Sequence, residues 1–220
     1  QKELAKKAPV HEVLLDMAVE KLPSPLVAQE YRIPNIWQGD LDSEVGQTMV
    51  NCDADGPLSL MITKIWMDPH AGEVAVGRVY SGTIKQGETV WASGAGKAER
   101  VQQVSMMVGG DRIQVPGVSA GNIAALTGVR SAAAGVTISR EKDETPFEAI
   151  RHYSEPVVTV AIEPKSMKDL PKFIGALRSL AKSDASLSVD TNHETGEALL
   201  SGMGELHLEI TVYRIEEEQN

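Results

Sequence analysis

The stretch Ser201-Gly202-Met203-Gly204-Glu205-Leu206-His207-Leu208-Glu209-Ile210 ends one structural element and begins another. Two glycines two positions apart allow the chain to leave a strand and turn tightly without a Cβ clash. The residues that follow alternate between apolar and polar as in a strand, yet they also fill two faces of a helix. We interpret the segment from about Gly204 as a helix, because a charged, glutamate-rich tail continues it.

This helix would be apolar on two opposite sides, and such a helix must pack against two partners. One face carries Leu206, Ile210 and Tyr213, and the opposite face carries Leu208, Val212 and Ile215. We expect one surface of the helix to meet neighbouring domains. The residues predicted for that interface are Glu205, His207, Leu208, Val212 and Ile215.

The polar residues of this stretch do not predict chemistry. His207 and Glu209 form an H-x-E pattern, but the zinc deaminases that use it need a later pair of cysteines. Cys52 is the single cysteine of the chain. An enzymatic role stays open as an alternative, carried by the polar cluster His193, Glu194, His207 and Glu209. We predict no catalytic, cofactor-binding or metal-binding residues in this chain.

Composition indicates an ordinary globular protein. The chain has 220 residues, of which 42% are hydrophobic and 24% charged, and its net charge is -10. An acidic chain is poorly suited to autonomous, non-specific nucleic-acid binding, which needs a basic surface. A single cysteine excludes an intramolecular disulfide and fits a cytoplasmic setting. We find no apolar run long enough for a membrane span and no secretion signal.

The chain divides into five predicted segments. Residues 1–22 predict a helix, and because the sequence starts inside it without Met, we expect a part of a longer protein. Residues 23–57 predict an irregular arm. Residues 58–141 predict short strands with glycine-rich turns, typical of a closed antiparallel barrel or a sandwich. Residues 142–154 are a charged linker. Residues 155–220 predict the order β-α-β-β-α, a ferredoxin-like domain lacking its last strand.

Two short segments imitate nucleotide or metal motifs and are interpreted as turns. Gly94-Ala95-Gly96-Lys97 resembles a phosphate loop, but Ala98 replaces the required Ser or Thr. Asp53-Ala54-Asp55-Gly56 imitates a GTPase switch and the start of a calcium loop, whose remaining ligands are missing.

Several separated segments together resemble the translocation GTPases, the family of elongation factor G and elongation factor 2. The stretches 77–83 (GRVYSGT) and 120–124 (AGNIA) are similar to sequence motifs of the second domain of translational GTPases. The stretches 155–165 (EPVVTVAIEPK) and 201–210 resemble the third domain of this family. Residues 8–17 (APVHEVLLDM) resemble the archaeal and eukaryotic branch.

The resemblance implies a fold of mixed β and α+β class, with an antiparallel β-barrel of the domain II type before the incomplete ferredoxin-like domain. It places the helix of residues 1–22 after a GTPase domain. The family's phosphate loop and N-K-x-D motif are absent from this sequence. We therefore expect no GTP hydrolysis by this chain, whereas the parent would use GTP and Mg²⁺ through its GTPase domain.

The resemblance also implies partners. In this family the barrel docks on the ribosome, through small-subunit ribosomal RNA and ribosomal protein, and the third domain relays to the GTPase and C-terminal domains of the same chain. No DNA and no membrane partner are expected. The predicted RNA contact is a turn with backbone amides beside cationic side chains, the groups that hold phosphate. Its residues are Arg78, Ser81, Gly82 and Lys85.

Two alternatives keep this architecture and change the function. The chain could come from a paralogous GTPase, such as the spliceosomal relative of elongation factor 2 or another ribosome-associated one. It could also be a stand-alone barrel that binds RNA or protein, although the missing last strand of the ferredoxin-like domain argues against that.

Overall fold

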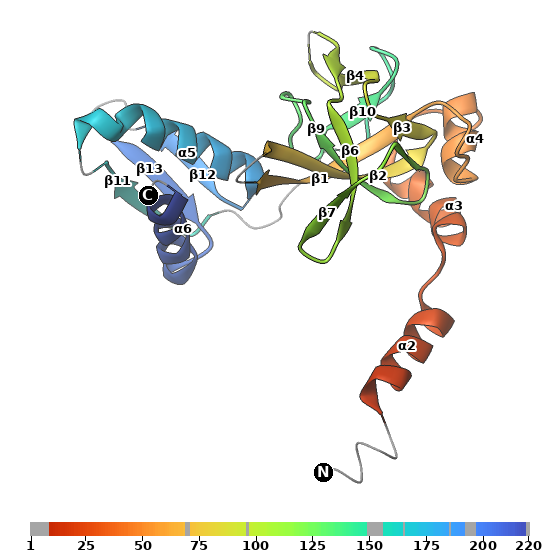
Figure 1. Ribbon diagram of the computed structural model, residues 1–220, viewed down its shortest axis with the longest axis horizontal. Coiled ribbons are helices and arrows are strands. Elements are labelled where there is room, and N and C mark those ends of the chain that lie inside the picture. The colour runs from red at the N-terminus through yellow and green to blue at the C-terminus, as the bar shows by residue number, and fades with distance from the viewer. Residues whose placement is uncertain are drawn as a thin grey trace.

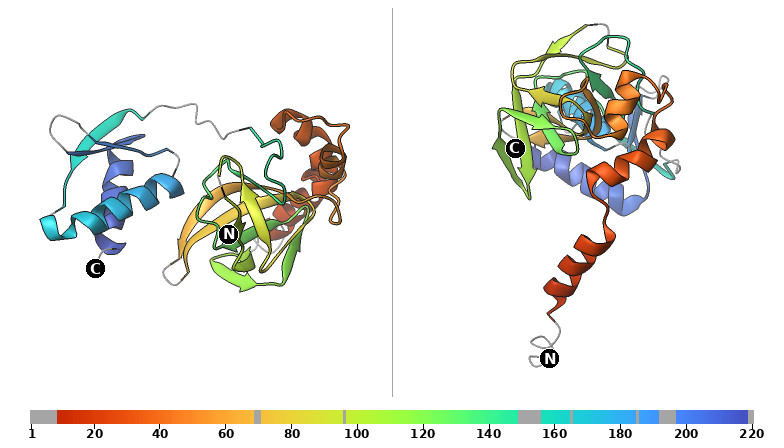
Figure 2. Two further views of the ribbon diagram at one scale, coloured as in Figure 1. Left: turned by 90° about the horizontal axis from the view of Figure 1, so that it is seen from above. Right: turned by 90° about the vertical axis from the view of Figure 1, so that its right-hand side faces the viewer.

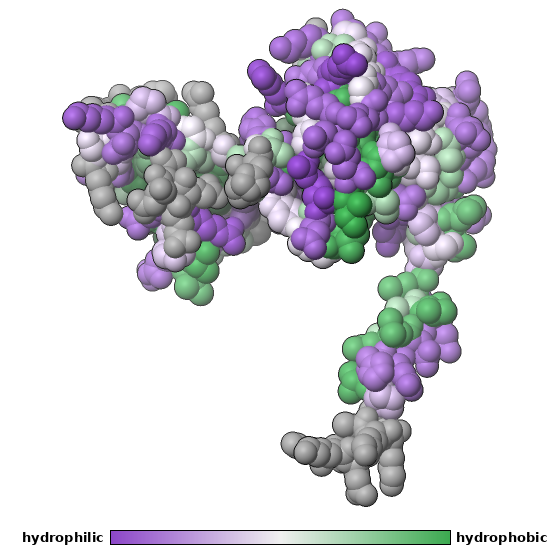
Figure 3. Space-filling view, viewed as in Figure 1, coloured by the Kyte–Doolittle hydropathy of each residue, from purple (hydrophilic) through white to green (hydrophobic). Residues whose placement is uncertain are grey.

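A computed structural model describes residues 9–68, 71–95, 97–148, 156–164, 166–184, 186–191 and 197–218. Figure 1 shows two bodies side by side, a larger β-domain flanked by short helices and a smaller domain of one sheet with two helices. The first helix of the described residues, α2 (Val10–Lys21), projects away from both bodies and has no buried residue. Hydrophobic residues lie along this helix in Figure 3, including Val10, Leu14 and Met17, each more than half exposed.

The segment 23–57, predicted to be irregular, contains two helices, so that prediction was wrong. These helices are α3 (Pro25–Ile36) and α4 (Glu44–Val50). Pro25 stands in the first turn of α3, where its missing N–H costs no hydrogen bond. Ser43 caps α4 by accepting a 3.1 Å hydrogen bond from the amide of Gly46. The sequence interpretation took the prolines as breaks and overlooked this cap.

The two helices are fastened to the outer face of the β-domain by a small core of their own. Ile33, Trp37, Met49, Met61 and Phe147 are buried together there. The indole Nε1 of Trp37 donates a 2.8 Å hydrogen bond to the carbonyl of residue 145, and Trp37 forms a β-bridge with Phe147. The segment after the barrel therefore runs back over the arm and holds it in place.

The β-domain is an antiparallel barrel, as predicted. Its strands are β1 (Ser59–Asp68), β2 (Gly72–Ser81), β3 (Thr83–Lys85), β4 (Thr89–Ala92), β5 (Glu99–Arg100), β6 (Gln103–Val108), β7 (Asp111–Gln114), β8 (Gly117–Ser119), β9 (Ile123–Thr127) and β10 (Thr137–Ser139). Within the described residues, eight of them form one sheet in the order β5-β4-β10-β1-β2-β9-β6-β7, and β3 pairs with β8. Figure 2 shows this sheet curling around its interior. Fully buried aliphatic side chains such as Leu60, Ile62, Ile84 and Leu126 fill the core.

The second domain has the predicted β-α-β-β-α order. Its elements are β11 (Val158–Ile162), a 3₁₀ turn (Met167–Asp169), α5 (Leu170–Ser183), β12 (Ser188–Thr191), β13 (Ala198–Gly202) and α6 (Glu205–Glu218). The strand order is β11-β13-β12, with both pairings antiparallel. In the part of the chain that is described, β11 pairs with β13 alone, so its other edge is an open sheet edge there.

Helix α6 is apolar on two sides, but the face that packs inward differs from the prediction. Leu208 and Ile215 are 3% and 7% exposed and belong to the core of their own domain, together with Leu200. Leu206 is 68% exposed, and Ile210 and Tyr213 are also exposed. Leu208 and Ile215, predicted for the interface, pack into their own domain instead, and the solvent-exposed apolar face carries Leu206, Ile210 and Tyr213.

The close turn before the helix explains this choice. A Cβ added at Gly202 would lie 2.7 Å from Cδ2 of Leu208, so the strand end and the helix are in direct contact through Leu208. Both faces of the helix are similarly apolar in sequence. The glycine contact selects the inward face, and that contact is not visible in hydrophobic periodicity.

Candidate RNA contact on the barrel and candidate interdomain face

Arg78 lies in β2, half-buried on the outer face of the barrel. Its guanidinium carbon is 5.9 Å from the ring centroid of Tyr80. Burial raises the pKa of Tyr80, and the positive charges of Arg78 and Arg32 offset part of that rise. Cys52 has a similar environment, because burial raises its thiol pKa and Arg78 acts against it. Arg78 therefore lies near Tyr80 and Cys52, on the side of the barrel that the helical arm covers.

The polar groups of Ser81 and Gly82 bind carbonyl groups of the turn that precedes the barrel. The buried hydroxyl of Ser81 donates a 2.6 Å hydrogen bond to the carbonyl of Pro57. The amide of Gly82 donates to the carbonyl of Asp53 at 2.7 Å. Gly82 has φ +72°, and a Cβ there would lie 2.8 Å from the carbonyl oxygen of Gly56. The predicted free amide of this turn is therefore absent at Gly82, and both residues hold the strand to the turn of residues 53–56.

Lys85, at the end of β3, is exposed and keeps its charge at the surface. Its amide is not free to bind phosphate, since it donates a 3.0 Å hydrogen bond to Oε2 of Glu88. Arg140 binds the same carboxylate through Oε1 at 2.6 Å and also donates to the carbonyl of Thr83 at 3.0 Å. The structure thus brings Arg140 beside Lys85. The sequence interpretation missed Arg140, because the two residues are far apart in the chain and are brought together through Glu88 and Thr83.

The first turn of α6 is tied to the end of α5. Nδ1 of His207 accepts a 3.2 Å hydrogen bond from the amide of Met203, so the ring proton is assigned to Nε2, which lies 3.3 Å from Oδ2 of Asp184. Burial would raise the pKa of Asp184, but its hydrogen bonds from Ser186 and His207 outweigh burial and lower it. His207 therefore has a structural partner, and Glu205 beside it is exposed.

Val212 and Ile215, the remaining residues of the predicted interface, border a cavity of about 620 Å³ at the other end of α6. Phe173 of α5 and Ile162 of the edge strand β11 complete its apolar lining. This cavity lies between β11 and the two helices. That Val212 contacts neighbouring domains stays a prediction.

No metal or membrane element accompanies these sites in the described part of the chain. Among the described residues, no three side chains of His, Cys, Asp or Glu come together as metal ligands. His193 and Glu194 of the alternative polar cluster lie outside the described residues. No helix in the described ranges is long and apolar enough to cross a bilayer.

Known protein families match each of the two domains. The family model described as Elongation factor Tu domain 2 matches residues 72–139, and the one described as Elongation Factor G, domain III matches residues 153–220. Elongation factor 2 of Picrophilus torridus is 58% identical over 218 residues, which is 99% of this chain and 30% of that protein. Those of Thermoplasma acidophilum and Thermococcus kodakarensis are each 56% identical over 99% of the chain and 30% of their own lengths.

The chain belongs to the elongation factor 2 family. It spans about 30% of the length of these curated relatives. A crystal structure of a Thermus thermophilus protein is similar in fold, with a TM-score of 0.68 at 28% identity over 94% of this chain and 27% of that one. The elongation factor 2 relatives also match residues outside the two family models, and this includes nearly all of the arm with α3 and α4.

The four predicted RNA-contact residues all fall in the segment that matches the domain 2 model, whereas Arg140 follows its last residue. In this elongation factor 2 segment, Ser81 and Gly82 build the strand turn, and Lys85 presents its charge to solvent. The exposed apolar face of α6 lies in the segment that matches domain III.

Proposed function

We propose that the chain is the barrel and ferredoxin-like part of a translation elongation factor that promotes GTP-dependent movement of tRNA and mRNA on the ribosome. The observation that supports this most strongly is the 58% identity to an elongation factor 2 across 99% of the chain, both domains and the arm included. The relatives named above are all elongation factor 2, which disfavours a paralogous GTPase or a stand-alone barrel.

The proposal divides labour between this chain and the rest of the longer protein. The nucleotide chemistry, with GTP and Mg²⁺, is assigned to the GTPase domain, because this sequence has no phosphate loop and no N-K-x-D motif. The barrel is assigned to small-subunit ribosomal RNA and the ribosomal protein beside it. The second domain is assigned to relay between the GTPase and C-terminal domains, and the factor is assigned to the cytoplasm.

The exposure of Lys85 and Arg140 supports a proposed RNA contact at these two residues. Phosphate oxygens are bound by cationic side chains at the surface, and of the four predicted residues Lys85 has the exposed charge. Arg140 keeps two fifths of its side chain exposed beside it. The net charge of -10 indicates that this contact is local, and that RNA binding by the isolated chain is weak.

We expect Lys85→Glu to remove the contact of the barrel with ribosomal RNA. The exchange is made in a full-length elongation factor 2 that carries this chain in place of its matching segment. Hydroxyl-radical footprinting of the small-subunit RNA should lose protection, and the slope of log affinity against log salt should fall by about 1, as for one lost phosphate contact.

Lys97→Glu is the matched control, because Lys97 is also an exposed lysine of the barrel and lies in a different loop. Its footprint and salt slope should equal those of the unchanged factor. An unaltered footprint for Lys85→Glu would place the RNA contact elsewhere on the barrel, whereas equal losses for both variants would indicate a general charge effect.

A further inference from the structure

The two domains meet where α5 lies against β1, and a lysine near the end of α5 bridges them. Nζ of Lys182 lies 3.1 Å from both Oε1 and Oε2 of Glu73, at the start of β2, and 3.4 Å from the carbonyl oxygen of Arg130. The side chains of Lys182 and Glu73 are 39% and 32% exposed. A cation in the last turn of a helix is also favoured by the negative end of the helix dipole. Lys182 thus joins the second domain to two separate segments of the barrel.

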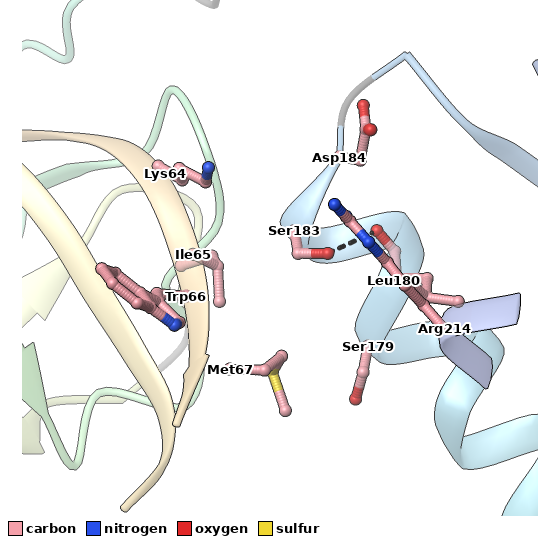
Figure 4. A pocket seen from close by; sticks show the side chains of 9 residues that line it. All are labelled: Lys64, Ile65, Trp66, Met67, Ser179, Leu180, Ser183, Asp184 and Arg214. Atoms are coloured by element: carbon pink, nitrogen blue, oxygen red, sulfur yellow. Dashed lines mark hydrogen bonds between the residues drawn. The ribbon is translucent and has the colours of Figure 1, made fainter. Parts of the chain in front are cut away.

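Apolar packing does not fix the same boundary. The hydrophobic core of the barrel and that of the second domain share no residue among those described. Between them lies a cavity of about 440 Å³, bordered by residues 64–67 of β1 on one side and by Leu180, Ser183 and Arg214 on the other (Figure 4). A gap removes the contacts that close-packed side chains would make across it. The polar contact beside the cavity therefore contributes to the relative orientation of the domains, together with the close approach of α5 to β1.

Among the described side chains around this boundary, Glu73 is the carboxylate that pairs with Lys182. Asp184 follows Lys182 closely in sequence, but its carboxylate is bound by Ser186 and by His207 within the second domain. Arg214 and Lys64 border the cavity and have the same charge as Lys182. These two cations cannot replace Glu73 as its partner.

We propose that Lys182 positions the second domain on the barrel, by bridging Glu73 and the carbonyl of Arg130, and that the open cavity lets the domains reorient when this bridge is broken. This goes beyond the assignment to translation, since it concerns the coupling between two domains within one chain. A partly exposed ion pair is screened by salt, so the orientation should loosen as ionic strength rises.

Residual dipolar couplings of the 220-residue chain test this proposal, because a pair of domains with a fixed orientation shares one alignment tensor. The couplings of each domain also report whether that domain keeps its own fold. We expect a common tensor for the unchanged chain at low salt. Lys182→Glu should give the second domain a separate, smaller tensor, and Lys182→Gln should do the same without adding a negative charge.

Lys172→Glu is the matched control, since Lys172 is an exposed lysine at the other end of the same helix. It should keep the common tensor. The charge exchange Lys182→Glu with Glu73→Lys should restore the common tensor. Raising the salt from about 0.1 M to about 1 M, which shortens the screening length from about 10 to about 3 Å, should loosen the unchanged chain. A common tensor in both Lys182 variants, or no recovery in the double variant, would overturn the proposal.

Discussion

Replacing Leu208 with alanine is expected to lower the free energy of unfolding of the second domain by about 2–5 kcal/mol. Leu208 is 3% exposed, packs with Leu200 and Ile215, and touches the backbone at Gly202. Truncation removes buried methyl groups and leaves a cavity between the helix and the strand end, where the chain turns too tightly to collapse. Such a loss is a large share of the stability of a small domain.

Leu206→Ala is the matched control, because Leu206 is two residues away in the same helix and 68% exposed. It should change the free energy of unfolding by no more than about 0.5 kcal/mol. Hydrogen exchange of the β13 amides in each variant measures the opening free energy of the second domain alone. The barrel amides serve as an internal reference. If Leu206→Ala were the costly change, the opposite face of α6 would pack inward and the orientation of this helix would be wrong.

Raising the pH from about 5 to about 8 is expected to destabilise the barrel through Glu144. Burial raises the pKa of this carboxyl from 4.5 to about 7, and the charge of Glu141 adds to the effect. Its buried Oε1 has no hydrogen-bond partner among the described residues. The charged carboxylate is therefore poorly solvated, and the folded chain favours the protonated form.

The direction follows from proton linkage. Glu144 binds its proton more tightly in the folded chain, so its stabilising contribution is fully present below pH 4.5 and is lost as the pH rises through about 7. Because the residue is only partly buried, we expect a loss of about 1–2 kcal/mol after allowance for screening by solvent. Urea unfolding of the chain across this pH range measures this loss in the free energy of unfolding.

Glu144→Gln should remove this part of the pH dependence, since glutamine does not titrate. Asp143→Asn is the control, because Asp143 is the neighbouring carboxylate and is exposed. It should leave the pH profile of the unchanged chain in place. Equal pH profiles for Glu144→Gln and the unchanged chain would mean that Glu144 does not titrate in this range.

The elements that could be predicted from sequence are those in which a local pattern has a single interpretation. Helix α5 carries one apolar stripe, and the glycine-rich turns of the barrel separate short strands, so both appear where the pattern places them. Helix α4 was missed because its cap, Ser43, stands in a segment interrupted by glycine and acidic residues. The two faces of α6 could not be told apart, because the contact between Gly202 and Leu208 forms only in three dimensions.

The candidate sites show the same limit. The sequence motif around Ser81 and Gly82 does indicate a tight turn. The carbonyl groups that accept hydrogen bonds from the Ser81 hydroxyl and the Gly82 amide, those of Pro57 and Asp53, come from a distant segment of the chain. Arg140 reaches the surface around Lys85 through the carboxylate of Glu88. Lys182 and Glu73 lie in different domains, so no periodicity could pair them.

The central claim, that this chain performs the part of elongation factor 2 it resembles, is tested most directly by exchanging it into a relative. In elongation factor 2 of Picrophilus torridus, the matching segment is replaced by this chain, and translocation on archaeal ribosomes is measured with GTP. We expect translocation at a rate of the same order as that of the unchanged factor. A chimera that folds and hydrolyses GTP on the ribosome, yet moves no tRNA, would contradict the claim.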